Sequence, residues 1–208
     1  IVVEDYHPVT SSEEGKKMEA TAQSLARAFG DGAERGRMKS DLTLQESMPP
    51  RGVAIISGED TPGVGESGMA RFYVVNVSRD DVPATEALTS MQEVARMGYL
   101  QKSMRGYILW LLKQIDEMPT LLHEDFLRNR AIAIEKTKGQ HGRTAEAIAH
   151  MMLGYDSMLR YLRDVGAITT DHSIKMRAHA WQVVTGNSRR QSEDMKEDRP
   201  SKIFLANI

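Results

Sequence analysis

Two adjacent carboxylates, Glu4 and Asp5, follow the apolar run Ile1–Val3 at the start of the chain. A β-branched run of this kind favours a strand, and Pro8 prevents the strand from continuing. One carboxylate at such a strand end can hold the water shell of Mg²⁺, and its neighbour can orient and deprotonate an attacking water. The pair therefore predicts hydrolysis of a phosphate bond, with Glu4 on the metal and Asp5 as the base. A strand that leaves the core into a solvated acidic turn is the simpler alternative.

A second polar cluster follows another apolar run. Val53–Ile56 predicts a buried strand that ends at Ser57, and Glu59 and Asp60 come shortly after it. Ligands of open α/β sheets bind at the carboxyl ends of the strands, so the two clusters would lie side by side if the strands are parallel neighbours. Ser57 would then hydrogen-bond the attacking water or the terminal phosphate. A strand end capped by Ser-Gly is the alternative.

Three basic residues are candidates for phosphate contacts. Arg71 lies between the Gly-rich loop Gly63–Gly68 and the apolar run Phe72–Val77, where it could reach the nucleotide of a neighbouring subunit. Arg37 and Lys39 lie in a short alternating stretch that could form a hairpin facing DNA phosphates. The alternatives are a surface ion pair for Arg71 and a solvated loop for the other two.

The elements that must position these residues follow from hydrophobic spacing. The three apolar runs predict three strands, and a helix ending near Gly30 supplies the crossover that a parallel pair needs. From Asp80 onward the spacing becomes helical, with the last of five helices ending at Gly186. We therefore expect an α/β fold, with a partial parallel sheet of three strands followed by a mainly α-helical bundle. The expected domains are an α/β core at 1–79, the bundle at 80–186, and a linker with the start of a further element at 187–208.

Composition excludes several classes of protein. The chain has no cysteine, which excludes disulfides, Cys-ligated metal sites and thiol nucleophiles. The formal net charge of −2 excludes a strongly basic nucleic-acid coat but leaves room for a local basic site. Because the apolar runs are too short for a membrane span and no secretory signal is present, we expect a cytoplasmic protein with no membrane partner. The opening on Ile1 predicts either a fragment of a longer protein or a trimmed natural N-terminus.

Taken in order, several segments resemble ATPases of phages and bacterial mobile elements that are described as primase–helicases. Val2–Pro8 resembles V-V-D-D-F-x-P, Leu25–Asp31 resembles L-L-R-A-x-G-D, and Pro50–Asp60 resembles P-R-G-L-x-I-x-T-G-E-D. Shorter matches occur at Gly36–Lys39, Ala70–Phe72, Tyr107–Leu111, His141–Arg143 and Gly166–Ile168. Each match is short, and their order and spacing over residues 1–170 carry the resemblance.

The resemblance implies the later half of a P-loop ATPase core of the AAA+ type, with its Walker B strand at the start of this chain. It implies ATP and Mg²⁺ as cofactors, bound by Glu4 and Asp5, and Asp5, Ser57 and Arg71 as catalytic residues, with Arg71 acting on the neighbouring subunit. Arg37 and Lys39 would contact DNA from a hairpin in a central pore. The implied partners are single-stranded or forked DNA and further copies of the protein in a ring such as a hexamer. ATP hydrolysis at the subunit interfaces would drive DNA movement in a replicative helicase.

Two departures from that family matter. No G-x-x-x-x-G-K-[ST] phosphate-binding loop occurs in the 208 residues, so we do not expect this chain alone to hydrolyse ATP efficiently. Glu4 also replaces the first Asp of the carboxylate pair. Because the glutamate side chain is longer, its carboxylate would hold the hydrated Mg²⁺ at a different distance from the strand. Two other functions are therefore compatible with the sequence. One is a non-catalytic helical interaction or oligomerisation module with a degenerate ATPase remnant, and the other is a Mg²⁺-dependent nuclease or phosphotransferase that uses Glu4, Asp5, Glu59 and Asp60.

Overall fold

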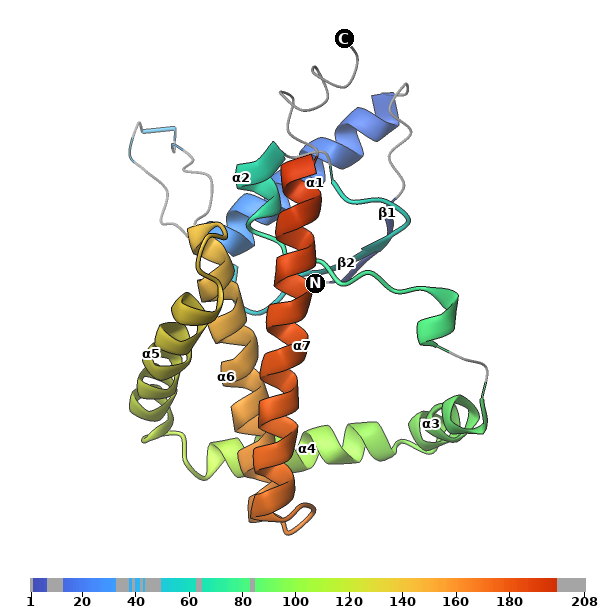
Figure 1. The fold of residues 1–208 in the computed structure, drawn as a ribbon, viewed down its shortest axis with the longest axis vertical. Coiled ribbons are helices and arrows are strands. Elements are labelled where there is room, and N and C mark those ends of the chain that lie inside the picture. The colour runs from blue at the N-terminus through green and yellow to red at the C-terminus, as the bar shows by residue number, and fades with distance from the viewer. Residues whose placement is uncertain are drawn as a thin grey trace. The chain divides into compact units, whose positions relative to one another are not determined.

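The computed structural model in Figure 1 describes residues 2–6, 13–32, 38, 40, 41, 43, 50–62, 65–82 and 85–197. For Asp5, Gly65, Glu66 and Glu197 the description is limited to the backbone. The chain forms two compact units. Unit 1 contains the described residues up to Tyr73 and those from Ser192 onward, and unit 2 contains Val74–Gln191.

Most of the described chain is helical. The elements are β1 (Val2–Tyr6), α1 (Glu13–Asp31), β2 (Ile55–Gly58), α2 (Gly65–Met69), the 3₁₀ helix η1 (Arg79–Asp81), α3 (Glu86–Arg96), α4 (Tyr99–Leu112), α5 (Met118–Lys136), α6 (Gly142–Asp164) and α7 (Thr170–Glu197). Helices α3 to α7 occur where the apolar spacing predicts them. Among the described residues, no helix combines the length and apolar character needed to cross a membrane.

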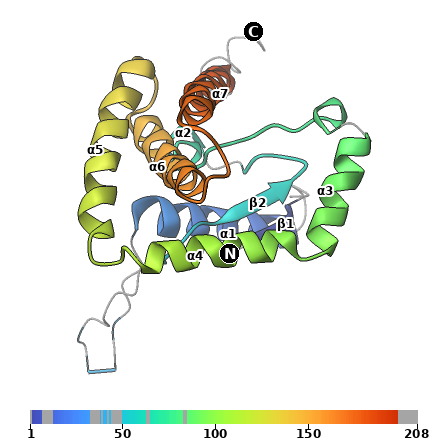
Figure 2. The same ribbon diagram turned by 90° about the horizontal axis from the view of Figure 1, so that it is seen from below.

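Unit 1 is built on the β1–α1–β2 segment. The two strands are parallel neighbours, with Val2 paired to Ile55, Val3 to Ile56 and Tyr6 to Gly58. Helix α1 connects them and lies alongside both strands (Figure 2). The predicted parallel pairing of the first two strands, with a helical crossover, is confirmed.

The prediction of a three-stranded sheet is wrong, because the described residues contain only β1 and β2. The predicted third strand, Phe72–Val77, has no strand pairing. The N–H of Val74 donates to Oε1 of Gln191 at 3.1 Å, and its carbonyl accepts from Nδ2 of Asn187 at 2.5 Å. Two amide side chains of α7 thus satisfy the backbone groups that a sheet would otherwise pair. The partial P-loop sheet followed by a bundle is therefore replaced by a mostly helical chain with one two-stranded sheet.

Both strands also differ from their predicted bounds. Strand β1 continues to Tyr6, so Glu4 and Asp5 lie within it rather than after it. Strand β2 begins at Ile55, which is 59% exposed, and the preceding Val53 is 74% exposed. The prediction of a buried second strand is therefore wrong. The buried apolar residues described in unit 1 are Tyr6, Ala22, Ala26 and Ala70.

Unit 2 is a helical unit in which α5, α6 and the first part of α7 run alongside one another (Figure 1). Helix α6 supplies the centre of its core, because Ile148 and Ala149 are fully buried and Met152 is 1% exposed. Ala133 of α5 and Trp181 of α7 are also buried. Large apolar side chains therefore fill the core of unit 2, whereas unit 1 buries mainly alanines.

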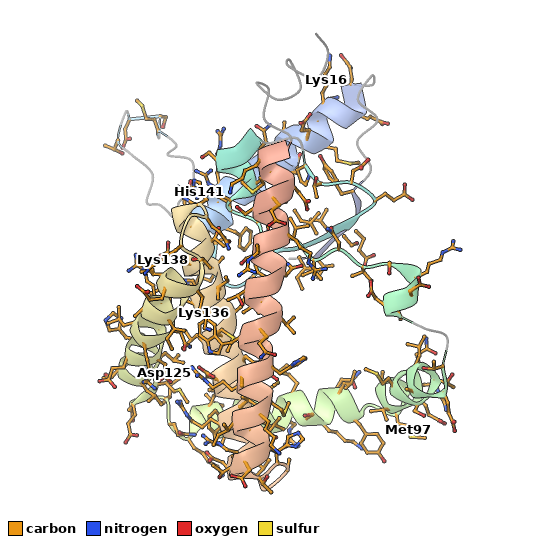
Figure 3. All side chains as sticks on the ribbon, viewed as in Figure 1. Lys16, Met97, Asp125, Lys136, Lys138 and His141 are labelled. Carbon is orange, nitrogen blue, oxygen red and sulfur yellow. The ribbon has the colours of Figure 1, made fainter. Side chains whose placement is uncertain are left out.

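A polar network joins the three helices of this core. The buried carboxylate of Asp125, labelled on α5 in Figure 3, accepts a hydrogen bond from Arg160 of α6 at 2.7 Å. Asn129 of α5 is 1% exposed and donates to Asp156 of α6 at 2.9 Å. Arg177 of α7 donates to Asp156 at 2.7 Å and to the Asn129 carbonyl at 2.8 Å. These bonds require one particular alignment of the three helices, because buried polar groups are costly when unpaired.

Helix α7 continues beyond its predicted end. Gly186 lies inside the helix, and the linker predicted from Asn187 is helical as far as Glu197. Glycine in a helix interior costs only about 1 kcal/mol relative to alanine. The turn that follows is held in place, since Asn187 bonds to Val74 and Ser188 is buried and donates to the carbonyl of Thr185. The rest of the predicted linker and further element, residues 198–208, lies outside the described residues.

Candidate functional site

A register shift in β1, which we call the β1 bulge, sets the backbone of two residues, Glu4 and Asp5, opposite the single residue Ser57 of β2. Between the paired residues Val3–Ile56 and Tyr6–Gly58, strand β1 contains Glu4 and Asp5, whereas strand β2 contains only Ser57. Bulges of this kind redirect side chains and are frequent next to active sites. Glu4 and Ser57 are both exposed, so a ligand can reach them.

Gly58 allows β1 and β2 to approach closely beside this bulge. A Cβ atom on Gly58 would collide with the backbone carbonyl oxygen of Tyr6 and would lie 2.8 Å from the Cβ atom of Tyr6. Any larger residue at this position would push the strands apart. Gly58 at the end of β2 is therefore required by strand packing.

Tyr6 is a site residue that sequence analysis missed. Its side chain is 2% exposed, and its hydroxyl has no hydrogen-bond partner among the described residues. Burial raises the pKa of the Tyr6 hydroxyl, and the negative charges of Glu19 and Asp60 raise that pKa further. Tyr6 lines a cavity of about 490 Å³ together with Val3, Glu14, Lys17, Met18, Thr21, Ala22, Leu25 and Ile56. The feature of the sequence that could have identified Tyr6 is its position directly after Glu4 and Asp5.

Arg71 is engaged within its own chain. Its Nε and Nη2 donate to the two carboxylate oxygens of Asp31, at 3.1 and 3.0 Å, and its Nη1 donates to the carbonyl of Ser67 at 2.6 Å. The Arg71 side chain is only 14% exposed. A bidentate arginine–carboxylate pair is among the stronger polar contacts in proteins. This arrangement matches the surface ion pair that sequence analysis gave as the alternative to a role at a neighbouring subunit.

The pair depends on Gly30 as well. A Cβ atom on Gly30 would lie 2.9 Å from Cβ and Cγ of Arg71, so the arginine stem occupies the space that a side chain would need. Two segments of the resemblance, Leu25–Asp31 and Ala70–Phe72, thus meet at one contact in unit 1. The contact between Asp31 and Arg71 is not predictable from the sequence, because 40 positions separate the two residues.

The remaining predicted residues are Glu59, Asp60, Arg37 and Lys39. Glu59 and Asp60 are exposed in the bend after β2. Arg37 and Lys39, predicted to contact DNA, lie outside the described residues. No group of three or more His, Asp or Glu side chains that could hold a metal ion occurs in the part of the chain that the structure describes. A cation at the bulge would therefore have to be held by one or two carboxylates and water, which is how proteins commonly bind Mg²⁺.

Comparison with known proteins adds no family. No protein-family model matches the chain, and no match was found among curated proteins or among solved structures. The resemblance to ATPases of mobile elements therefore stays a prediction.

Proposed function

We propose that this chain contributes the Mg²⁺ and water-activating residues of an ATP-driven DNA motor. The observation that supports the proposal is the β1 bulge, which sets Glu4 and Asp5 against Ser57 on a parallel neighbour. In this arrangement Glu4 holds the hydrated cation, Asp5 accepts the proton of the attacking water, and Ser57 orients that water. When bound, Mg²⁺ neutralises charge on the phosphates.

The proposal needs a phosphate-binding segment that the 208 residues do not contain, since they have no G-x-x-x-x-G-K-[ST] motif. It also assigns DNA contacts to Arg37 and Lys39, with further copies of the protein completing the sites. Arg71 has no catalytic part in it, because a role in a neighbouring subunit would first require breaking its bonds to Asp31 and Ser67.

The first test uses the 208-residue chain and Mn²⁺, a paramagnetic substitute for Mg²⁺. We expect Mn²⁺ to broaden the amide NMR signals of Glu4, Asp5 and Ser57 before others, and Mg²⁺ to reverse the broadening. Glu4→Gln should weaken this effect about tenfold or more, because it removes a ligand charge. Glu13→Gln, which changes an exposed carboxylate at the start of α1, is the matched control. Uniform broadening, or equal loss in both variants, would count against a cation site at the bulge.

The second test is DNA-stimulated ATPase activity of the full-length product of the gene that encodes this chain. Asp5→Asn should lower turnover by about 100-fold or more, the usual contribution of a general base, and leave ATP binding intact. Asp60→Asn, in the same unit but outside the bulge, should leave turnover unchanged. A wild-type protein without ATPase activity would refute the motor, and Mg²⁺-dependent DNA cleavage lost in Asp60→Asn would support the nuclease alternative.

A further inference from the structure

Helix α4 uses only one of its sides inside unit 2. The Tyr107 hydroxyl lies 2.8 Å from Oγ of Ser157, and Trp110 Nε1 donates to Asp164 at 2.9 Å. Both aromatic rings also contact the ring of Tyr161, at centroid distances of 5.5 and 5.8 Å. These contacts fix one side of α4 against α6.

A second side of α4 carries an exposed row of apolar side chains, which we name the α4 stripe. It consists of Met97, Leu100, Met104, Ile108, Leu112 and Ile115, which are 52, 59, 58, 49, 56 and 57% exposed. At 100° per residue the four members inside α4, which are Leu100, Met104, Ile108 and Leu112, lie within about 60° of one line along the helix. Met97 and Ile115 lie in the turns at its two ends. Figure 3 labels Met97 at the turn between α3 and α4, at a distance from α5 and α6. Neither α3 nor α4 has a buried residue.

The exposed apolar area of the α4 stripe is comparable to that of a protein–protein interface. The six side chains expose roughly 600 Å², which is the upper end of the largest apolar patch on a typical monomer. Met91 and Val94 of α3 are also exposed, at 70 and 41%, but they belong to a separate helix and are not counted in this area. An area of roughly 600 Å² on each partner corresponds to about 1,200 Å² in total, which is the lower end of specific protein–protein interfaces.

The spacing of the stripe is symmetric about position 106. Met104 and Ile108 lie two residues on either side of it, and Leu100 and Leu112 lie six, so the members inside α4 form two pairs. An antiparallel copy of α4 would therefore set each of these four members against the opposite member of its pair. This is the self-complementarity that a two-fold interface requires, in which residue i meets j and j meets i. A different protein as partner would not require such symmetry.

We propose that two copies of this chain associate through their α4 stripes, antiparallel, about a two-fold axis at the level of Gly106. Gly106 itself is on the side of α4 that faces α6, where a Cβ atom would collide with the Tyr161 hydroxyl. The stripe is therefore free to meet the second copy while the opposite side stays packed on α6. This dimer concerns unit 2 only and does not depend on the proposed nucleotide chemistry.

The test is sedimentation equilibrium of the 208-residue chain, which has a mass of 23.3 kDa. We expect a dimer, and a dissociation constant at least about 100-fold higher for Met104→Glu or Ile108→Lys, since each places a charge in the apolar centre. Ile174→Lys, at a 62% exposed position of α7, is the matched control and should leave the dimer unchanged. Circular dichroism checks that each variant keeps its helical content.

The antiparallel register has its own test. Met104→Glu combined with Ile108→Lys should restore the dimer, because each Glu then faces the Lys of the other copy. Met104→Glu combined with Leu100→Lys has the same charges four residues apart but should stay monomeric, because Leu100 faces Leu112 of the second copy. A wild-type chain that is monomeric at every concentration, single variants that dimerise like wild type, or a folded double variant that is not restored would each overturn the proposal.

Discussion

The two units hold their charged groups in different surroundings. In unit 2 the Asp125–Arg160 pair has side chains 6 and 23% exposed and lies beside a core of large apolar residues. In unit 1 the carboxylate of the Asp31–Arg71 pair is more exposed, at 32%, although Arg71 is only 14% exposed, and the neighbouring core consists mainly of alanines. Small side chains bury little apolar area, so unit 1 gains less from the hydrophobic effect. We therefore expect unit 1 to unfold at a lower free energy than unit 2. The Asp31–Arg71 ion pair should then account for a larger share of the stability of its unit than the Asp125–Arg160 pair does.

The largest effect should come from the core of unit 2. Ile148→Ala removes a fully buried side chain from α6 and should lower the free energy of unfolding by about 3 to 4 kcal/mol, through lost burial and a cavity. Ile174→Ala makes the same change at an exposed position of α7 and should cost less than about 0.5 kcal/mol. Urea denaturation measures both values, and hydrogen exchange shows which unit loses protection. Equal costs for the two variants would contradict the assigned core.

The two ion pairs should differ when each loses its arginine. Arg160→Met removes one of the two arginine partners of the buried Asp125 carboxylate. The other partner, Arg128, is 62% exposed, so the loss should cost about 2 kcal/mol. Arg71→Met should cost about 1 kcal/mol, because water can reach Asp31 after the loss. Arg96→Met, which breaks a fully exposed pair with Glu93, is the control and should cost less than about 0.5 kcal/mol. Denaturation followed by hydrogen exchange assigns each loss to its unit. A larger cost for Arg71→Met than for Arg160→Met would reverse the comparison.

The smallest effect concerns a turn outside both cores. The Ser78 hydroxyl and backbone N–H both donate to Asp81 at 2.7 Å, and they hold the Asp81 pKa below its ordinary value of 3.8, with help from Arg190. Because the folded-state pKa is the lower one, the stabilisation is complete above pH 3.8 and is lost as pH falls through the folded-state value. Ser78→Ala should move the Asp81 pKa back toward 3.8 in a carboxyl NMR titration. Ser90→Ala, an exposed serine of α3, should not move it, and an equal shift in both variants would exclude the turn as the cause.

Part of the fold could be predicted because its causes are local. The 3.6-residue spacing of apolar side chains marked helices α3 to α7, and two short apolar runs joined by a helix indicated parallel pairing of β1 and β2. The same reasoning identified Glu4, Asp5 and Ser57 as residues that share one edge of the fold. Their alignment through a bulge was not predictable, because it depends on the close contact between Gly58 and Tyr6.

The remaining features depend on residues far apart in the sequence. Phe72–Val77 has the composition of a strand, but Asn187 and Gln191, more than 100 positions away, bond to Val74 and take the place of a strand partner. Arg71 has the position of a catalytic arginine, but Asp31 at the end of α1 binds it. The amino-acid sequence by itself indicated helices α3 to α7 and the parallel pairing of β1 and β2, because hydrophobic spacing and apolar runs are local features. The tertiary structure alone decided which of the predicted site residues are committed to other contacts, because hydrogen bonds and burial depend on which distant groups are brought together.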